Sequence, residues 1–218
     1  MVLNLAERLE LPLRERNLLL NAAGYAAVFP ERPLADPALE PARRAVDLVL
    51  KGHEPYPALA VDRHWTLLAA NKAVGALIAS ADPVLLRPPV NVLRLSLHPD
   101  GLAPRIANLS EWRAHLIHRL QRQIEISADP LLTELLRERE SYPAPADRAT
   151  SAHDYAGVVV PLQLVTNLGS LSFFSTITVF GTPIDVTLSE LALESFFPAD
   201  DATAEALRRM AEPGVPTP

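Results

Sequence analysis

The chain contains no cysteine among its 218 residues. A disulfide framework, a thiolate zinc site and a cysteine nucleophile are therefore excluded. The absence of cysteine also suits a reducing cytosol, and we expect a cytoplasmic protein. No apolar run reaches the roughly 18–20 residues that a membrane-spanning helix needs. Residues 1–17 carry acidic side chains and lack the apolar region of a signal peptide, so we expect no membrane partner.

Positive charge and glycine-rich motifs are scarce as well. The formal net charge of −6 argues against a chain that coats nucleic acid by charge alone. No G-x-S-x-G nucleophile elbow is present, and neither glycine-rich phosphate-binding pattern occurs. The residues thus support no enzymatic reaction and no cofactor. A small-molecule enzyme that uses His98 or His115 is the least favoured alternative.

One group of side chains has the spacing of a metal site. Glu111, His115 and His118 are separated by four and three residues on a predicted helix, so all three share one face, as zinc ligands would. Arg119 and Arg122 lie beside them, and positive neighbours disfavour a bound cation. We therefore interpret the group as a solvated polar face and expect no metal.

The residues that are present predict a globular domain with stiff connections. Hydrophobic residues make up 49% of the chain and charged residues only 21%, which is enough to bury a core. Proline is unusually frequent, with 21 residues against 8 glycines, and it gathers between the predicted elements. The length allows one large domain, or one domain with an appendage.

Periodicity predicts helices and strands in a definite order. Helices are predicted over residues 3–20 with a break at Pro12, and over 41–51, 72–80, 110–127, 131–140 and 202–211. Two strands are predicted within Ala58–Ala70, and three more over Tyr155–Thr166, Leu171–Phe180 and Val186–Phe197. The order indicates an α+β fold of the PAS-like class, with a five-stranded antiparallel sheet, helices over one face, and a short helical N-terminal segment in front.

The hairpin over residues 169–198 organises the chain. In its first strand Phe173, Ser175 and Ile177 share one face, and Thr176 and Thr178 share the other. An apolar face with a few hydroxyl groups is typical of a ligand pocket, although an ordinary half-buried hairpin has the same pattern and is more common.

Several stretches resemble the ligand-binding domain of MmyB-like regulators, bacterial transcription factors of the Xre helix-turn-helix class. They are LSFFSTITVFGTPIDVTLSELALESFFPADDAT from Leu171, YPALAVDRHWTLLAANKAV from Tyr56, NVLRLSLHPDGL from Asn91 and LAERLELPLRERNLLLNAAGYAAVFPERPL from Leu5. The resemblance covers nearly the whole chain and implies a PAS-like sensor behind a DNA-binding domain. His153 and Asp154, in SAHDYAG, match the family pattern only in part.

The resemblance divides the chain into three parts. Residues 1–34 are expected to be the C-terminal remnant of a helix-turn-helix domain and its linker, 35–211 the PAS-like ligand-binding domain, and 212–218 a disordered tail. The expected function is effector sensing in a one-component regulator. DNA would be contacted only through an N-terminal domain missing from this chain, and the regulator would be a homodimer.

We expect the effector pocket between the sheet and the helices. Its mainly apolar lining favours a small apolar ligand such as a fatty acid, whose polar head would need a donor such as His115, Arg119 or Asn71. A ligand-free dimerisation module that uses the same apolar face is the main alternative. The predicted ligand-binding residues are Trp65, Leu67, Asn71, Leu93, His115, Leu116, Arg119, Leu120, Phe173, Ser175, Thr176, Ile177 and Leu193.

Overall fold

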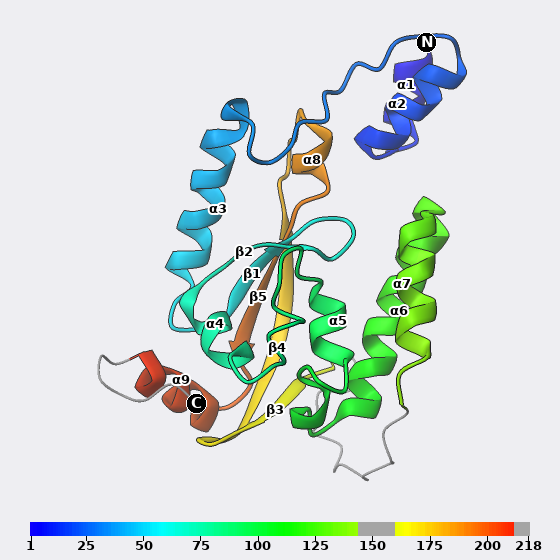
Figure 1. Ribbon diagram of the computed structural model, residues 1–218. Coiled ribbons are helices and arrows are strands. Elements are labelled where there is room, and N and C mark those ends of the chain that lie inside the picture. Colours follow the sequence, from blue (N-terminus) through cyan, green and yellow to red (C-terminus); the bar gives the residue numbers. More distant parts are fainter. Residues whose placement is uncertain (144–159, 212–218) are drawn as a thin grey trace.

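The computed structural model describes residues 1–143 and 160–211 (Figure 1). Its α-helices are α1 (Val2–Arg8), α2 (Leu13–Ala22), α3 (Glu40–Gly52), α4 (Lys72–Ile78), α5 (Val92–Leu97), α6 (Leu109–Ser127), α7 (Pro130–Glu140), α8 (Val186–Ser189) and α9 (Asp201–Ala211). Its strands are β1 (Ala58–Val61), β2 (Leu67–Ala70), β3 (Leu162–Thr166), β4 (Gly169–Val179) and β5 (Ala192–Pro198). Two short 3₁₀ helices are η1 (Pro37–Leu39) and η2 (Ala103–Arg105).

The strands form one five-stranded sheet in the order β2-β1-β5-β4-β3. Every neighbouring pair is antiparallel. Two strands come first, a helical middle follows, and three strands close the domain, so the predicted α+β, PAS-like fold is confirmed. The first hairpin, β1 and β2, forms one end of the sheet. It joins the later strands because β1 pairs with the last strand, β5.

Helices cover the sheet on two sides (Figure 1). The inserted helices α4 to α7 pack on one face, where their apolar side chains join those of β3 and β4 in the main core. Helix α3 covers part of the other face, since Val46 and Leu50 contact Ala58, Ala60 and Leu191. Strand β1 is consequently buried on both faces along its whole length, which suits its small and branched residues.

Burial along β4 changes halfway. Leu171 and Phe173 are each 1% exposed, because Leu171 pairs with β3, Phe173 pairs with both β3 and β5, and both side chains lie in the main core. Ile177 and Val179 share the same face of the strand but are 49% and 58% exposed. Among the described residues, this second half pairs with β5 alone. The strand thus extends beyond the layer of helices that covers its first half.

The turn from β3 to β4 lies where the sequence predicts it. Thr166 pairs with Gly169 across a two-residue loop, and Gly169 has a φ of +109°, a conformation that favours glycine. The predicted strand over Tyr155–Thr166 is confirmed for Leu162–Thr166. Its residues 155–159 lie outside the described residues, as does the predicted tail at 212–218.

The prediction of a strand over Val186–Phe197 is wrong for its first part. Val186–Ser189 is a helical turn, α8, and β5 begins only at Ala192. Asp185 causes this because its Oδ1 accepts a hydrogen bond from the Thr187 N–H at 2.9 Å and caps the turn. The same carboxylate pairs through Oδ2 with Arg32 at 3.1 Å, so Asp185 has a structural role. A local cap therefore overrides the period-two pattern here.

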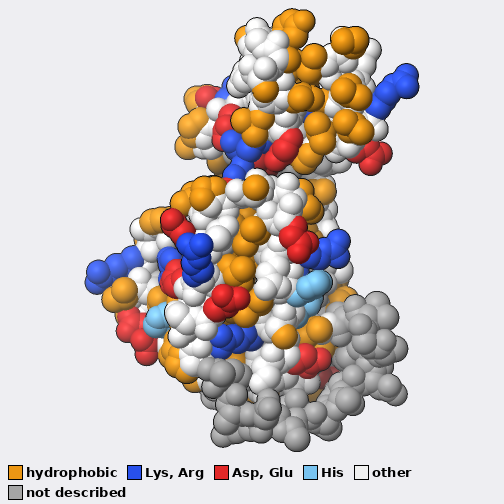
Figure 2. All heavy atoms as spheres, turned by 90° about the vertical axis from the view of Figure 1, so that its right-hand side faces the viewer, with side chains coloured by type: hydrophobic (Ala, Val, Ile, Leu, Met, Phe, Trp, Pro, Cys, Tyr) orange, Lys and Arg blue, Asp and Glu red, His pale blue; other side chains and the backbone are white. Residues whose placement is uncertain are grey.

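The N-terminal segment is helical with a break, as predicted. Helices α1 and α2 form a lobe above the sheet, joined to it by an extended connection (Figure 1). This connection folds back on α2, because the Asn17 side chain accepts from the N–H groups of Val28 and Phe29 and donates to the Phe29 carbonyl at 2.7 Å. Apolar side chains cover much of the lobe's surface (Figure 2), and they include Leu5, Leu9 and Leu18.

Within the described ranges, no helix is both long enough and apolar enough to cross a membrane.

Candidate functional site

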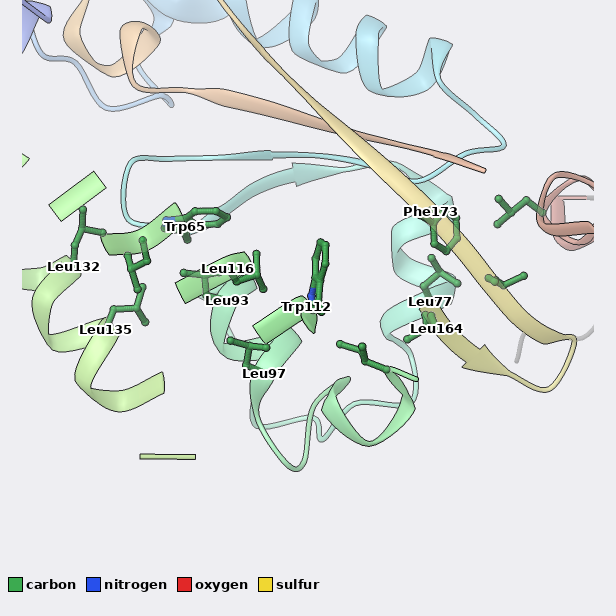
Figure 3. Packing of buried hydrophobic residues seen from close by; sticks show 14 of the residues in the cluster. Trp65, Leu77, Leu93, Leu97, Trp112, Leu116, Leu132, Leu135, Leu164 and Phe173 are labelled. Carbon is green, nitrogen blue, oxygen red and sulfur yellow. The ribbon is translucent and has the colours of Figure 1, made fainter. Parts of the chain in front are cut away.

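An apolar cavity of about 90 Å³ lies between the sheet and helices α4, α5 and α6. The side chains around it are almost all aliphatic or aromatic, and Ser96 and Glu194 are its polar members. The cavity is lined by Leu59, Trp65, Leu67, Val74, Ile78, Val92, Leu93, Leu95, Ser96, Leu102, Trp112, Leu116, Leu162, Glu194 and Phe196. Figure 3 shows Trp65, Leu93, Leu116 and Trp112 beneath the sheet.

The turn between β1 and β2 directs Trp65 into the cavity. Asp62 accepts hydrogen bonds from the N–H groups of His64 and Thr66, each at 2.8 Å, and this closes a tight turn. Trp65 has a φ of +65° in the turn, a left-handed conformation that is uncommon for a bulky residue. Its indole N–H donates to the Gln123 side chain on α6 at 2.9 Å, so a backbone strain and a hydrogen bond together fix the ring.

Helices α5 and α6 supply the opposite wall. Asn91 caps α5 by accepting from the Arg94 N–H at 3.0 Å, and it donates to the His64 carbonyl in the β1–β2 turn at 2.8 Å. On α6, the Trp112 indole N–H donates to Ser96 Oγ of α5 at 3.0 Å. These two bonds tie α5 to the hairpin on one side and to α6 on the other.

One charged pair borders this apolar space. Glu194 of β5 is 5% exposed, and its Oε1 accepts from Arg119 Nη1 at 3.2 Å and from Ser175 Oγ at 2.9 Å. The Arg119 guanidinium lies 4.6 Å from the centre of the Trp65 ring. A carboxylate buried in apolar surroundings needs such partners, because its desolvation is costly without them.

Some of the predicted ligand-binding residues lie at the cavity and others next to it. Trp65, Leu67, Leu93 and Leu116 line it. Arg119 and Ser175 lie behind the wall and bind Glu194, and His115 stacks on Trp112 with ring centres 5.6 Å apart. Leu120 and Phe173, which are 0% and 1% exposed, belong to the main core and not to the lining.

Four predicted residues lie elsewhere in the fold. Asn71 is a buried cap of α4 whose side chain binds the backbone of Ala58, Leu50 and Tyr56. Leu193 points to the opposite face of the sheet and packs in the cluster beneath α3. Thr176 and Ile177 are exposed on the far half of β4. Of the predicted lining face from Phe173 to Ile177, the structure thus places Phe173 in the main core and leaves Ile177 exposed to solvent.

Sequence reasoning missed most of the lining, including Glu194, Phe196 and Trp112. A signal for the first two was present, because Glu194 and Phe196 share one face of β5 by the period of two. Trp112 is one of the buried residues of α6.

The predicted polar face of α6 is engaged in local contacts. The Asn108 side chain donates to Glu111 at 3.1 Å, and burial followed by the charge of Arg119 lowers the pKa of His115 below its ordinary value. In residues 1–143 and 160–211, no three His, Asp or Glu side chains are grouped so as to hold a metal ion.

A second, charged hollow of about 480 Å³ lies where α2 meets the sheet domain. Arg14 of α2 binds Glu190 through two bonds, Nε to Oε1 at 2.6 Å and Nη2 to Oε2 at 3.0 Å. Arg63 of the β1–β2 turn also reaches Glu190, at 3.3 Å, and pairs with Asp129. The hydrogen bond to Glu190 is the main cause that raises the pKa of Arg14 above its ordinary value. This hollow is ionic, so the apolar cavity is the better candidate for a small apolar ligand.

The family model for the MmyB-like transcription regulator ligand binding domain matches residues 42–210. The chain belongs to this family. The match includes every residue that lines the apolar cavity and leaves out α1 and α2. It also identifies the chain with a family of regulator domains and not with an enzyme family. No curated protein matches the sequence significantly.

Proposed function

We propose that this chain is the effector-sensing part of a cytoplasmic one-component transcription regulator, and that the apolar cavity beneath the sheet is its effector site. The observation that carries the proposal is the cavity itself, a mainly aliphatic and aromatic space within the family-matched residues. Such spaces are few per protein and are the usual sites of small-molecule binding. The effector is then a small, mainly apolar molecule.

The size of the cavity suggests how sensing would work. A cavity of about 150 Å³ accepts one benzene molecule, and this one measures about 90 Å³. An elongated ligand therefore enters only if α5 and α6 separate further from the sheet. Such a ligand favours the wider conformation by the difference between its affinities for the two states, and this population shift is the signal.

A straight-chain fatty acid is the candidate that the sequence suggests, and a chain-length series tests it. Each buried methylene contributes about 0.8 kcal/mol before ordering costs. Thermal unfolding of the full 218-residue chain should therefore shift upward as the fatty acid lengthens, until the widened cavity is full. Melting temperatures that do not depend on chain length would contradict an apolar effector site.

DNA binding is proposed only through a helix-turn-helix domain, of which residues 1–34 would be the C-terminal remnant and linker. Specific DNA readers need a recognition element, and α1 and α2 are helices of seven and ten residues that do not match one. The 218-residue chain should therefore bind operator DNA weakly at about 0.15 M salt. Tight, sequence-specific binding in a fluorescence anisotropy titration would contradict this domain assignment.

A homodimer is part of the proposal, and a ligand-free dimerisation module is the second candidate function. The exposed Ile177 and Val179 on the far half of β4 favour it, because exposed apolar residues on a strand are typical of an interface. Native mass spectrometry of the protein purified from cells separates the two candidates. A dimer with no bound small molecule, and no response to the chain-length series, would favour the dimerisation module.

A further inference from the structure

The wall of the apolar cavity contains one buried carboxylate, that of Glu194. From its surroundings we infer that the effector carries a hydroxyl group that donates a hydrogen bond to this carboxylate, and that a carboxylate head group is disfavoured. The inference rests on the proposed effector site and, in place of the fatty acid that the sequence suggests, names an apolar alcohol or phenol as the chemical class of the ligand.

The hydrogen bonds that Glu194 accepts leave its Oε2 atom able to accept another one. Arg119 and Ser175 both donate to Oε1, and within residues 1–143 and 160–211 no donor reaches Oε2. A carboxylate accepts at both oxygens and cannot donate while ionised. An incoming O–H group thus gains a charge-assisted hydrogen bond.

Arg119 decides between the possible head groups. Its guanidinium is held over the Trp65 ring and already pairs with Glu194, so the two charges cancel at this point of the wall. A ligand carboxylate would add a second negative charge beside Glu194 and would have to compete for the same guanidinium. A ligand ammonium would bury a third charge beside Glu194, whose charge is already paired with that of Arg119. A neutral hydroxyl meets neither cost.

The two tryptophans of the chain make the inference directly measurable. Both Trp65 and Trp112 line the cavity, so intrinsic fluorescence reports its occupancy. The parent chain is titrated with octanol, octanoate and octylamine, which share one chain and differ in the head group. We expect octanol to bind about tenfold more tightly than octanoate, the effect of one hydrogen bond to a charged group, and more tightly than octylamine.

Variants separate the carboxylate from the rest of the wall. In Glu194→Gln the ratio of octanol to octanoate affinity should fall by about tenfold, because the negative charge is lost and Arg119 is released. In the double variant Arg119→Gln/Glu194→Gln, octanoate has no cation to pair with at the wall, so the preference for octanol should return. Glu205→Gln, on the exposed side of α9, is the matched control and should keep the parent ratio.

The outcomes distinguish this inference from the proposed function. If octanoate binds the parent as tightly as octanol, or if Glu194→Gln keeps the parent ratio, the hydroxyl inference is overturned and the effector site stands. If none of the three probes changes the fluorescence, the cavity is not a ligand site, and the proposed function is overturned together with the inference.

Discussion

Individual residues of the same face have different roles in this protein because their surroundings differ. Phe173 and Ile177 are four residues apart on β4 and point the same way, yet one lies in the main core and the other is half exposed. Ser175, between them, binds Glu194 at the cavity wall. Alternation assigns the three residues to one face, but it does not give the burial or the partners of each one.

Substitutions at Phe173 and Ile177 should therefore have opposite profiles. Phe173→Ala removes a ring that is 1% exposed and should lower the free energy of unfolding by about 3–5 kcal/mol. Ile177→Thr keeps the branched shape without adding a charge opposite Glu194, so it should leave stability within about 0.5 kcal/mol of the parent and leave binding of a fatty acid unchanged. Urea unfolding and fluorescence titration measure the two effects. A loss of ligand binding in a folded Ile177→Thr protein would show that the sensing face extends beyond the cavity.

Among the elements, α5 is held by a polar contact to α7 as well as by the apolar core. Arg94 of α5 binds Glu138 of α7 through two hydrogen bonds, of 2.9 and 2.7 Å, and Tyr142 donates to the same carboxylate at 2.9 Å. The hydrogen bonds from Arg94 are the main cause that lowers the pKa of Glu138 from 4.5 to about 2. The position of α5, and with it the cavity wall, thus depends on an ionised Glu138.

This clasp, the hydrogen bonds of Arg94 and Tyr142 to Glu138, makes stability depend on pH in a defined direction. Because the pKa of Glu138 is lower in the folded chain, its contribution to stability is present above pH 4.5 and is lost as the pH falls from there toward about 2. In Glu138→Gln that part of the acid-induced loss should be missing, and the variant should be less stable than the parent at neutral pH. Urea unfolding at a series of pH values measures both. Equal acid-induced losses in the two proteins would contradict the clasp, and Glu134→Gln on the same helix is the control.

The elements could be predicted from the sequence to different degrees. Alternation predicted β4, and periodicity placed the starts of α4 and α7 within one residue, because both signals are local. The helical turn α8 could not be predicted from alternation, because the cap at Asp185 competes with the pattern and is reinforced by Arg32, far away in the sequence. The six residues of α5 are too few for a helical period, so its wall of the cavity was not predicted as a helix.

Across the whole molecule, the β1–β2 turn connects the cavity to the N-terminal lobe. Trp65 of this turn lines the cavity, and Arg63, two residues earlier, binds Glu190 together with Arg14 of α2. The Gln123 side chain joins the two ends of the connection, since it accepts from Trp65 and donates to the Arg63 carbonyl at 2.6 Å. A shift of Trp65 on ligand entry would therefore move the ion pair that holds α2.

Removing the ion pair should release the lobe and leave the sensor intact. In Arg14→Met, amide hydrogen exchange in α2 should become about tenfold faster, because a partly buried, two-bond pair is worth on the order of 1–2 kcal/mol. Exchange in β4 and β5 should not change. Arg8→Met, at an exposed position of α1, is the matched control. Unchanged exchange in α2 of Arg14→Met would show that the lobe is held by other contacts.

The central claim is that the cavity beneath the sheet binds the effector, and filling it tests this most directly. Val92 of α5 lines the cavity and is partly exposed, so a larger side chain fits there by occupying the ligand's space, whereas Val84 is 61% exposed in a loop. Isothermal titration calorimetry with decanol and decanoate compares the parent with Val92→Phe and Val84→Phe. The cavity predicts that Val92→Phe weakens binding of the tighter ligand by at least about tenfold and that Val84→Phe leaves it unchanged. Parent-like affinity in a folded Val92→Phe protein would contradict the claim.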